Sequence, residues 1–348
     1  MTLEVFTTAQ PEKWDAVARS FKGHDVYYLS GYVKAFQVHG DGEPHLFYYK
    51  DNNLRGLNVV MRRDISRHAC FTGKIEDNTW FDFSTPYGYG GWLIEGDGDS
   101  SELFECYQSW CQKHNVVSEF VRYHPVLGNH VHSNSFYSVQ ALGKTIAMDL
   151  SSPEIIWSNF TSNNRNKVRK ALKSGVEIYN GRYPEIFEEF REIYNATMDR
   201  DGADDYYYFT PDFYKTVMME LSHEAQVFYA ELDGQVIAAS IMLAANGKLN
   251  YHLSGSLREY NNLAPTNLLL YTAALWGCRN GCSTFHLGGG VGSSEDSLYK
   301  FKSAFYRGEP CEFYIGGKIF LHEKYEELVA MRDPSKIMNS GFFPKYRA

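Results

Sequence analysis

The chain has 348 residues, of which 44% are apolar and 16% aromatic, and its formal net charge is −8. This length predicts two domains, because one domain usually has about 100–200 residues, and the apolar content excludes a disordered chain. The acidic balance argues against a protein that coats nucleic acid, although it leaves room for one local basic patch.

Cysteine spacing and hydropathy exclude further classes. None of the six cysteines forms a CxxC pair, so no zinc-site spacing is present and no metal is expected. The N-terminus has no signal-peptide pattern. The longest apolar stretch, about 268–278, is shorter than the ~20 residues that span a bilayer. We expect a cytoplasmic monomer without stable membrane insertion.

The first half of the chain alternates short strands and helices. Strands are predicted near 3–6, 45–49, 54–62 and 117–123, and helices near 11–21, 30–38 and 101–114. The same order of elements recurs in the second half without obvious sequence identity, so the first half is interpreted as a degenerate copy. A domain boundary is predicted near Leu150.

The second half has clearer periodicity. Its turns at Asp233-Gly234 and Asn246-Gly247 are strong hairpin signals, because glycine tolerates the positive φ that such turns require. Helices are predicted at 157–174, 184–198, 211–221, 265–279 and 294–306. Strands are predicted at 176–179, 225–232, 235–244, 248–253, 283–287 and 312–315.

This β-α-α-β-β-β-α-β-α-β order is that of the N-acetyltransferase (GNAT) superfamily. We therefore predict an α/β (α+β) fold of two GNAT-like domains, each a mixed, mostly antiparallel twisted sheet flanked by helices. Residues 1–150 with 317–348 form the first domain and 151–316 the second. The sheet of this superfamily opens between its fourth and fifth strands, which are 248–253 and 283–287 here.

Several stretches resemble the FemABX family of non-ribosomal peptidyl transferases. They are a basic helix and Gly-Val strand at 164–178, the segments 251–256 and 265–270, Phe285-His-Leu-Gly-Gly-Gly290, the Phe-Lys helix at 298–305, and Thr85-Pro-Tyr-Gly-Tyr-Gly-Gly91. The resemblance covers nearly the whole chain. It implies transfer of an amino acid from aminoacyl-tRNA to an amine of a peptidoglycan precursor, with the first domain on the acceptor side and a C-terminal segment that returns to it.

The chain departs from the patterns of these proteins in two places. No heptad run is present for the coiled-coil arm of some family members. The acetyl-CoA branch of the superfamily has a glycine-rich pyrophosphate loop where this chain reads Asn261-Asn-Leu-Ala-Pro-Thr-Asn267, without glycine. This difference disfavours acyl-CoA as the donor without excluding it.

Lys302 is the first catalytic candidate, since it matches the lysine of the Phe-Lys motif, which the resemblance places at the transfer site. A cation there would stabilise developing negative charge. Tyr251 and His252 lie on the strand beside the predicted opening, so one of the two must face it, and His252 is a candidate proton acceptor. The alternative for each is a packed or solvated side chain.

Substrate-binding residues are also carried over from the resemblance. Lys34 and Arg200 match positions that hold the phosphates of the acceptor, Phe301 would pack at the site, and Tyr207 and Tyr208 would wall the cleft. Whether Lys34 and Arg200 share one cleft is left open. Donor-binding candidates are the basic helix face Arg165, Arg169 and Lys173, with the helix start Pro265, Thr266 and Asn267.

The leading hypothesis is a FemAB-like aminoacyl or acyl transferase that needs no cofactor beyond its donor. Acyl transfer to an amine requires positioning, oxyanion stabilisation and proton removal, but no covalent nucleophile. Two alternatives stay open: an acyl-CoA-dependent N-acetyltransferase, and a non-catalytic module that binds a nucleotide-sugar or a peptide.

Overall fold

The computed structural model describes residues 2–337 and 341–348. The chain divides into two compact units, Met1–Leu142 with Phe313–Ala348 (unit 1) and Gly143–Glu312 (unit 2). The divisions fall a few residues before the expected boundaries near 150 and 317. The reason is that two long strands, β7 (Ser138–Asp149) and β13 (Cys311–Ile319), run through them.

Unit 1 is a mixed sheet in the order β1-β2-β3-β4-β6-β13, with β5 added against β3. Only β4 and β6 pair in parallel among the strand pairs of the described residues of this unit. The strands are β1 (Thr2–Phe6), β2 (Glu43–Lys50), β3 (Leu54–Asp64), β4 (Phe81–Ser84), β5 (Leu93–Gly96) and β6 (Val116–Arg122).

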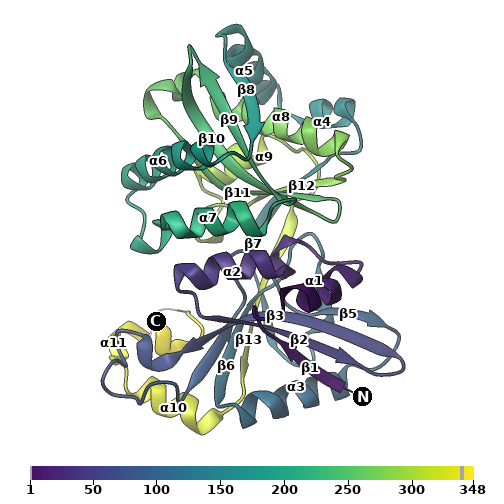
Figure 1. Ribbon diagram of the computed structural model, residues 1–348, viewed down its shortest axis with the longest axis vertical. Helices are drawn as coiled ribbons and strands as arrows, with labels where there is room; N and C mark the ends of the chain where they lie inside the picture. The colour runs from purple at the N-terminus through teal and green to yellow at the C-terminus, as the bar shows by residue number, and fades with distance from the viewer. Residues whose placement is uncertain (1, 338–340) are drawn as a thin grey trace. The chain divides into compact units, whose positions relative to one another are not determined.

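Helices cover both faces of this sheet (Figure 1). They are α1 (Pro11–Ser20), α2 (Ser30–His39), α3 (Ser101–Lys113), α10 (His322–Ala330) and the short α11 (Pro334–Ile337). Trp92, Tyr107 and Phe47 are completely buried and pack edge to face, so aromatic rings fill much of this core.

The C-terminal segment returns to unit 1, as the resemblance implied. Arg347 donates hydrogen bonds to both carboxylate oxygens of the buried Asp82, which also accepts from Arg63. The Tyr346 hydroxyl lies 3.1 Å from the Asp82 carboxylate and 2.8 Å from the Ser118 hydroxyl. A buried carboxylate between two arginines holds the end of the chain on the sheet.

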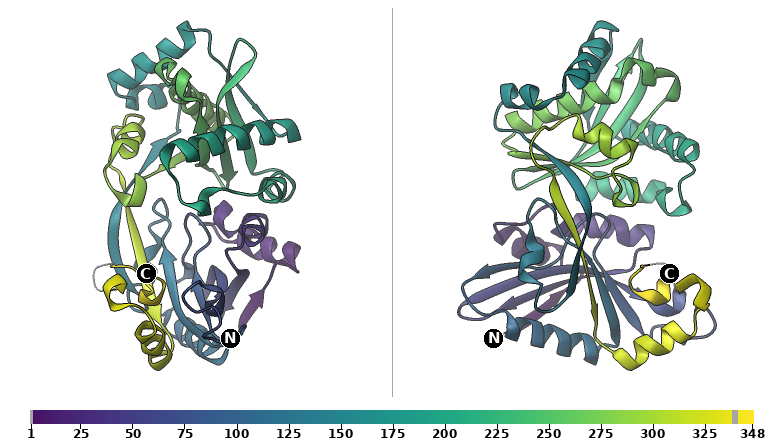
Figure 2. Two further views of the ribbon diagram at one scale, coloured as in Figure 1. Left: turned by 90° about the vertical axis from the view of Figure 1, so that its left-hand side faces the viewer. Right: turned by 180° about the vertical axis from the view of Figure 1, so that it is seen from behind.

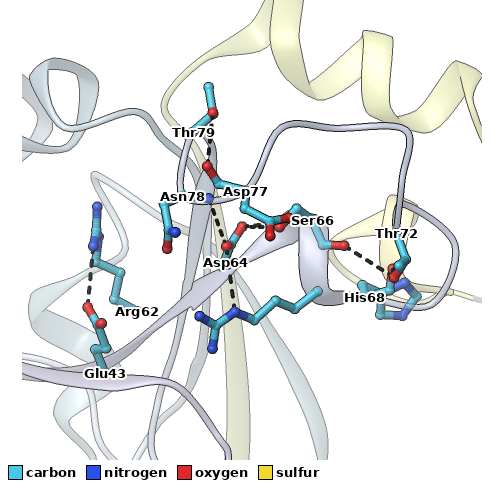
Figure 3. Close-up of polar contacts among 10 residues, drawn as sticks. Glu43, Arg62, Asp64, Ser66, His68, Thr72, Asp77, Asn78 and Thr79 are labelled. Atoms are coloured by element: carbon cyan, nitrogen blue, oxygen red, sulfur yellow. Dashed lines mark hydrogen bonds and ion pairs between the residues drawn. The ribbon is translucent and has the colours of Figure 1, made fainter.

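Asp64 organises the long connection between β3 and β4 (Figure 3). Its carboxylate accepts hydrogen bonds from the backbone and side chain of Ser66 at 3.0 and 2.8 Å, and from the backbone of Asn78 at 2.9 Å. Arg62, two residues earlier on β3, instead forms an ion pair with Glu43 at 3.4 Å. One carboxylate thus ties both ends of this loop together.

Unit 2 has the strand order β7-β12-β11-β10-β9-β8. Its further strands are β8 (Glu177–Gly181), β9 (Ala225–Leu232), β10 (Gln235–Ala245), β11 (Lys248–Ser256) and β12 (Thr284–Gly288). Asp233, Gly234, Asn246 and Gly247 all have positive φ, between 47° and 81°, so both predicted hairpin turns are confirmed.

The helices of unit 2 lie on the two faces of its sheet (Figure 2). They are α4 (Pro153–Asn159), α5 (Ser162–Lys173), α6 (Pro184–Asp201), α7 (Pro211–Glu220), α8 (Pro265–Arg279) and α9 (Ser297–Ser303). Side chains from α4, α5, α8 and α9 share one core cluster with the sheet. α6 packs against β10 and β11.

Two helix predictions need correction. The helix expected at 157–174 is broken at Phe160 and Thr161, because both residues are extended and the Thr161 hydroxyl caps α5. The helix expected at 294–306 covers only Ser297–Ser303, because Asp296 caps it at residue 297. No helix in the described ranges is long and apolar enough to cross a bilayer.

Candidate functional site

The sheet of unit 2 opens where the sequence predicted. β11 and β12 are parallel and pair only from Lys248–Asn250 against Thr284–His286. Beyond Asn250, β11 continues to Ser256 without pairing to β12. The backbone of both strands is therefore available at this point to neighbouring side chains.

A β-bulge lies beside the opening. Tyr251 is opposite Met242 and Leu253 is opposite Ile241, so His252 is the extra residue of the bulge. Bulges change the direction in which side chains leave a strand. The bulge therefore coincides with the residues that the sequence analysis selected on this strand.

Lys302 comes from α9 and is buried, with 8% of its surface exposed. Its Nζ donates a hydrogen bond of 2.7 Å to the carbonyl oxygen of Gly289, just after β12. The same Nζ lies 5.8 Å from the centroid of the Tyr251 ring on β11. Lys302 thus lies beside both edges of the opening, with the Tyr251 ring near its ammonium.

Burial lowers the pKa of Lys302 to about 8, and the nearby Asp296 carboxylate opposes that shift. The side chain is therefore still mainly an ammonium at neutral pH. A cation that is partly desolvated interacts more strongly with negative charge than a solvated one does. This arrangement suits stabilisation of an oxyanion.

The imidazole of His252 is uncharged, whereas the Lys302 side chain is mainly charged. Burial lowers the pKa of His252 to about 3, so its imidazole is neutral at physiological pH and a weak base. Its expected role as a proton acceptor gains no support from this environment and stays a prediction.

The glycine-rich loop and Asp296 hold α9 in place. Asp296 accepts hydrogen bonds from the backbone of Tyr299 at 2.8 Å and of Val291 at 3.1 Å. A Cβ on Gly290 would collide with Asp296 and the Ser294 carbonyl, so only glycine fits there. Sequence reasoning missed Asp296, although an Asp before a helix start is a capping signal.

A cavity of about 240 Å³ lies on the other side of α9. It is lined by Asn163, Asn164, Lys167, Asn267, Ser297, Lys300, Phe301 and Ala304. Among the residues predicted from sequence, the cavity contains Asn267 and Phe301. Pro265 is buried and Thr266 half-buried in the first turn of α8, and neither lines the cavity.

The three basic residues predicted on one face of α5 have different surroundings. Arg165 donates from Nη1 to the Phe160 carbonyl and, at 3.5 Å, to that of Trp157, so it satisfies the end of α4. Arg169 lies over the Trp157 ring at 5.3 Å, and Lys173 is exposed. The lysine of α5 that reaches the cavity is Lys167, which sequence reasoning did not select.

The proposed acceptor residues are distributed over both units. In unit 2, Arg200 donates to the Ser256 carbonyl at the end of β11 (2.9 Å) and to Asp201 (3.0 Å). Tyr208 donates to Asp199 at 2.8 Å, and Tyr207 is exposed. Lys34 is half-buried on α2 of unit 1. The roles of these residues stay predictions.

Unit 2 contains a second, more acidic cavity of about 490 Å³ on the α6 side of the β9–β10 hairpin. Its lining includes Glu189, Glu192 and Glu231, with Tyr183 and Tyr229 joined by a hydroxyl hydrogen bond of 3.0 Å. It includes none of the residues predicted from sequence. No cluster of His, Cys, Asp and Glu suited to a metal ion occurs within 2–337 and 341–348.

Comparison with known proteins agrees with this architecture. Residues 158–302 match the model of the acetyltransferase (GNAT) domain family. A curated relative, the UDP-N-acetylmuramoylpentapeptide-lysine N(6)-alanyltransferase of Weissella viridescens, is 26% identical over 174 residues, or 49% of this chain. The match spans 50% of that relative, so this chain aligns with about half of the relative's length.

Solved structures extend the likeness to nearly the whole chain. The crystal structure of FemX has a TM-score of 0.68 at 13% identity, covering 94% of this chain and 99% of FemX. The C-terminal domain of a putative lysylphosphatidylglycerol synthetase from Agrobacterium fabrum has a TM-score of 0.57 at 14% identity, covering 90% and 93%. At these identities the likeness establishes the fold, which confirms the predicted GNAT-like architecture.

Proposed function

We propose that this chain, a FemABX-like member of the GNAT superfamily, transfers an aminoacyl group from aminoacyl-tRNA to an amine of a cell-wall precursor. The observation that carries the proposal is the buried ammonium of Lys302, held against the Gly289 carbonyl at the opening between β11 and β12. The likeness to an alanyltransferase that acts on a lysine of a muramoyl pentapeptide supports the choice of acceptor.

The reaction needs no bound cofactor or metal. The neutral amine attacks the ester carbonyl of the donor, and a C–N bond forms while the carbonyl oxygen becomes negative. Collapse of this intermediate breaks the ester C–O bond, the amine loses one proton, and the ribose oxygen of the donor gains one. Lys302 would stabilise the oxyanion, because its buried ammonium lies beside the Tyr251 ring and the Gly289 carbonyl.

On the acceptor side, Lys34 and Arg200 are proposed to bind phosphate groups. Arg200 already holds the end of β11 through the Ser256 carbonyl, which gives its guanidinium a defined position. An aminoacyl-tRNA donor also implies action in the cytoplasm, where that donor is made. Substitution of either cation should raise KM for the acceptor and leave KM for the donor unchanged.

The direct test incubates the protein with alanyl-tRNA and a UDP-linked muramoyl pentapeptide that contains lysine, and follows the acceptor by mass spectrometry. A mass increase of one aminoacyl residue, absent with deacylated tRNA and strongly reduced by Lys302→Met, supports the proposal. The exposed Lys215→Gln on α7 is the matched control, because it removes a lysine of the same unit away from α9.

An acyl-CoA-dependent N-acetyltransferase is the second candidate, favoured by the match of residues 158–302 to an acetyltransferase domain. It predicts release of free thiol from acetyl-CoA in the presence of amines, with no product from aminoacyl-tRNA. A non-catalytic binding module predicts a thermal shift with the muramoyl peptide but no turnover, and indifference to Lys302→Met. A ligand at 100 times its Kd should stabilise the protein by about 2.7 kcal/mol.

A further inference from the structure

The cavity beside α9 has a strongly cationic lining. Lys167 reaches it from α5 and Lys300 from α9, and no carboxylate lines it. Neither lysine forms an ion pair with any residue in the described parts of the chain. Both lysines are exposed, and together they give this hollow a positive potential in a chain of net charge −8, which favours an anionic ligand.

The floor of the cavity is a fixed pair of carboxamides. Asn267, 5% exposed, donates from Nδ2 to Asn164 Oδ1 at 2.7 Å. Asn164, 1% exposed, donates in turn to the Ala304 carbonyl at 3.3 Å. These two bonds orient the Asn267 amide and leave its Oδ1 without a hydrogen-bond donor among the described residues. This oxygen is an acceptor for a ligand hydroxyl.

Two helix N-termini add to the positive potential. Asn163 and Asn164 belong to the first turn of α5, a helix of 12 residues, and Asn267 belongs to the first turn of α8, a helix of 15 residues. The first turn of a helix carries unsatisfied N–H groups and the positive end of the helix dipole. This effect supplements the two lysines, which supply full charges.

α9 connects the cavity to the proposed transfer site. Ser297, Lys300, Phe301 and Ala304 have the spacing i, i+3, i+4 and i+7, so they share one face of the helix and line the cavity together. Lys302 points to the other side of the helix, toward Gly289. A helix with side chains is about 10 Å across, so a donor held in the cavity would have to extend by about that distance around α9 for its acyl group to meet Lys302.

We infer that Lys167, Lys300 and Asn267 form a binding site for a phosphate and the neighbouring sugar hydroxyl of the acyl donor, with Phe301 as an apolar wall. This inference rests on the proposed function and adds the residues that hold the donor. It differs from the predicted donor face of Arg165, Arg169 and Lys173, of which Arg165 already donates to two backbone carbonyls. The phosphate belongs to an RNA 3′ end or to coenzyme A, and the experiment distinguishes these sources.

Binding is measured by fluorescence anisotropy with a 5′-labelled RNA hairpin that ends in a single-stranded CCA-3′, and separately by calorimetry with coenzyme A. The variants are Lys167→Gln, Lys300→Gln and the double substitution. Lys170→Gln is the matched control, because Lys170 is exposed on the same helix and lies outside the cavity. A hairpin without the single-stranded end controls for binding to duplex.

We expect the double substitution to raise the Kd for the CCA-ended hairpin about 10-fold at a fixed salt concentration, and to reduce the salt slope by about 0.7, the amount that one lost phosphate contact on a single strand accounts for. Lys170→Gln should change the Kd by less than about twofold. In turnover, the double substitution should raise KM for the donor and leave kcat nearly unchanged, unlike substitution of Lys302.

The outcomes separate the inference from the proposed function. If the wild-type protein ignores RNA but binds coenzyme A in a manner that depends on both lysines, the phosphate site stands and the aminoacyl-tRNA donor is wrong. If the protein transfers an amino acid from tRNA while both lysine variants bind RNA like the wild type, the function stands and the inference is overturned. An equal loss of affinity in Lys170→Gln also overturns it.

Discussion

Lys302 Nζ donates a hydrogen bond of 2.7 Å to the carbonyl oxygen of Gly289, and this bond joins α9 to the end of β12. The bond places a buried cation where β11 and β12 separate. Because a backbone carbonyl rather than a carboxylate holds it, the ammonium keeps its net charge for a substrate.

Lys302→Met should lower kcat by about 10²–10³-fold, the loss that follows removal of one oxyanion-stabilising donor. KM for the acceptor should change little, since the charge is needed in the transition state more than in the ground state. Steady-state kinetics with both substrates measure this split. A Lys302→Met enzyme with wild-type kcat would show that the lysine only supports the loop.

The activity should fall as the pH rises through about 8, the lowered pKa of Lys302, if the ammonium is the active form. Burial causes this shift of the pKa, so the fall in activity near pH 8 is a property of the folded protein. In Lys302→Arg the side chain stays charged, and the falling limb should move to higher pH. Profiles of kcat against pH for both proteins measure it. An unchanged limb in the arginine variant would assign it to another group.

Gly290→Ala should weaken both the cap of α9 and activity. A Cβ at this position would displace Asp296 and the Ser294 carbonyl, and loss of a helix cap costs about 1 kcal/mol. The melting temperature and kcat should both fall. Gly23→Ala is the control, since a Cβ there meets its nearest neighbour at an ordinary 3.5 Å.

Glu119→Gln should remove a pH dependence of stability in unit 1. Burial raises the pKa of Glu119 from 4.5 to about 7, so between these values the folded state binds more protons than the unfolded state. The free energy of unfolding of the wild type should therefore fall with rising pH over this window, by roughly 3 kcal/mol at most.

The glutamine is neutral throughout, and its Nε2 can donate to Asn58 Oδ1 once the Asn58 amide turns over, since Asn58 Nδ2 now donates to Glu119 and its Oδ1 has no partner among the described residues. Its oxygen can still accept from Tyr107 and Tyr137, which donate to Glu119 at 2.9 and 2.7 Å. Chemical denaturation at pH values on both sides of the window measures the difference. The exposed Glu105→Gln is the control, and an undiminished slope in Glu119→Gln would contradict the assignment.

Arg165→Gln should reduce stability by about 1 kcal/mol, because it removes the charged donor of the Phe160 and Trp157 carbonyls. Arg169→Gln, on the same helix with an exposed side chain, should cost less. Melting temperatures of the two variants give the comparison. A larger loss of stability in Arg169→Gln would mean that the hydrogen bonds from Arg165 to the end of α4 contribute little.

The sequence by itself determined most of the local structure of unit 2. Turns, caps and helix starts depend on a few neighbouring residues, so the pairs Asp233-Gly234 and Asn246-Gly247 and the start of α8 at Pro265 could be placed correctly. The order of these elements was sufficient to predict the fold, and Lys302 and Phe301 followed from the resemblance of the Phe-Lys segment.

Only the tertiary structure decided which side chains meet. Arg165, Lys167 and Arg169 are close on one helix, yet Arg165 binds carbonyls of α4, Arg169 covers Trp157, and Lys167 lines the cavity. The opening after Asn250 and the bulge at His252 arise from pairing between strands distant in sequence. Such contacts depend on packing across the sheet and between α5, α8 and α9, which helical spacing and local propensity do not encode.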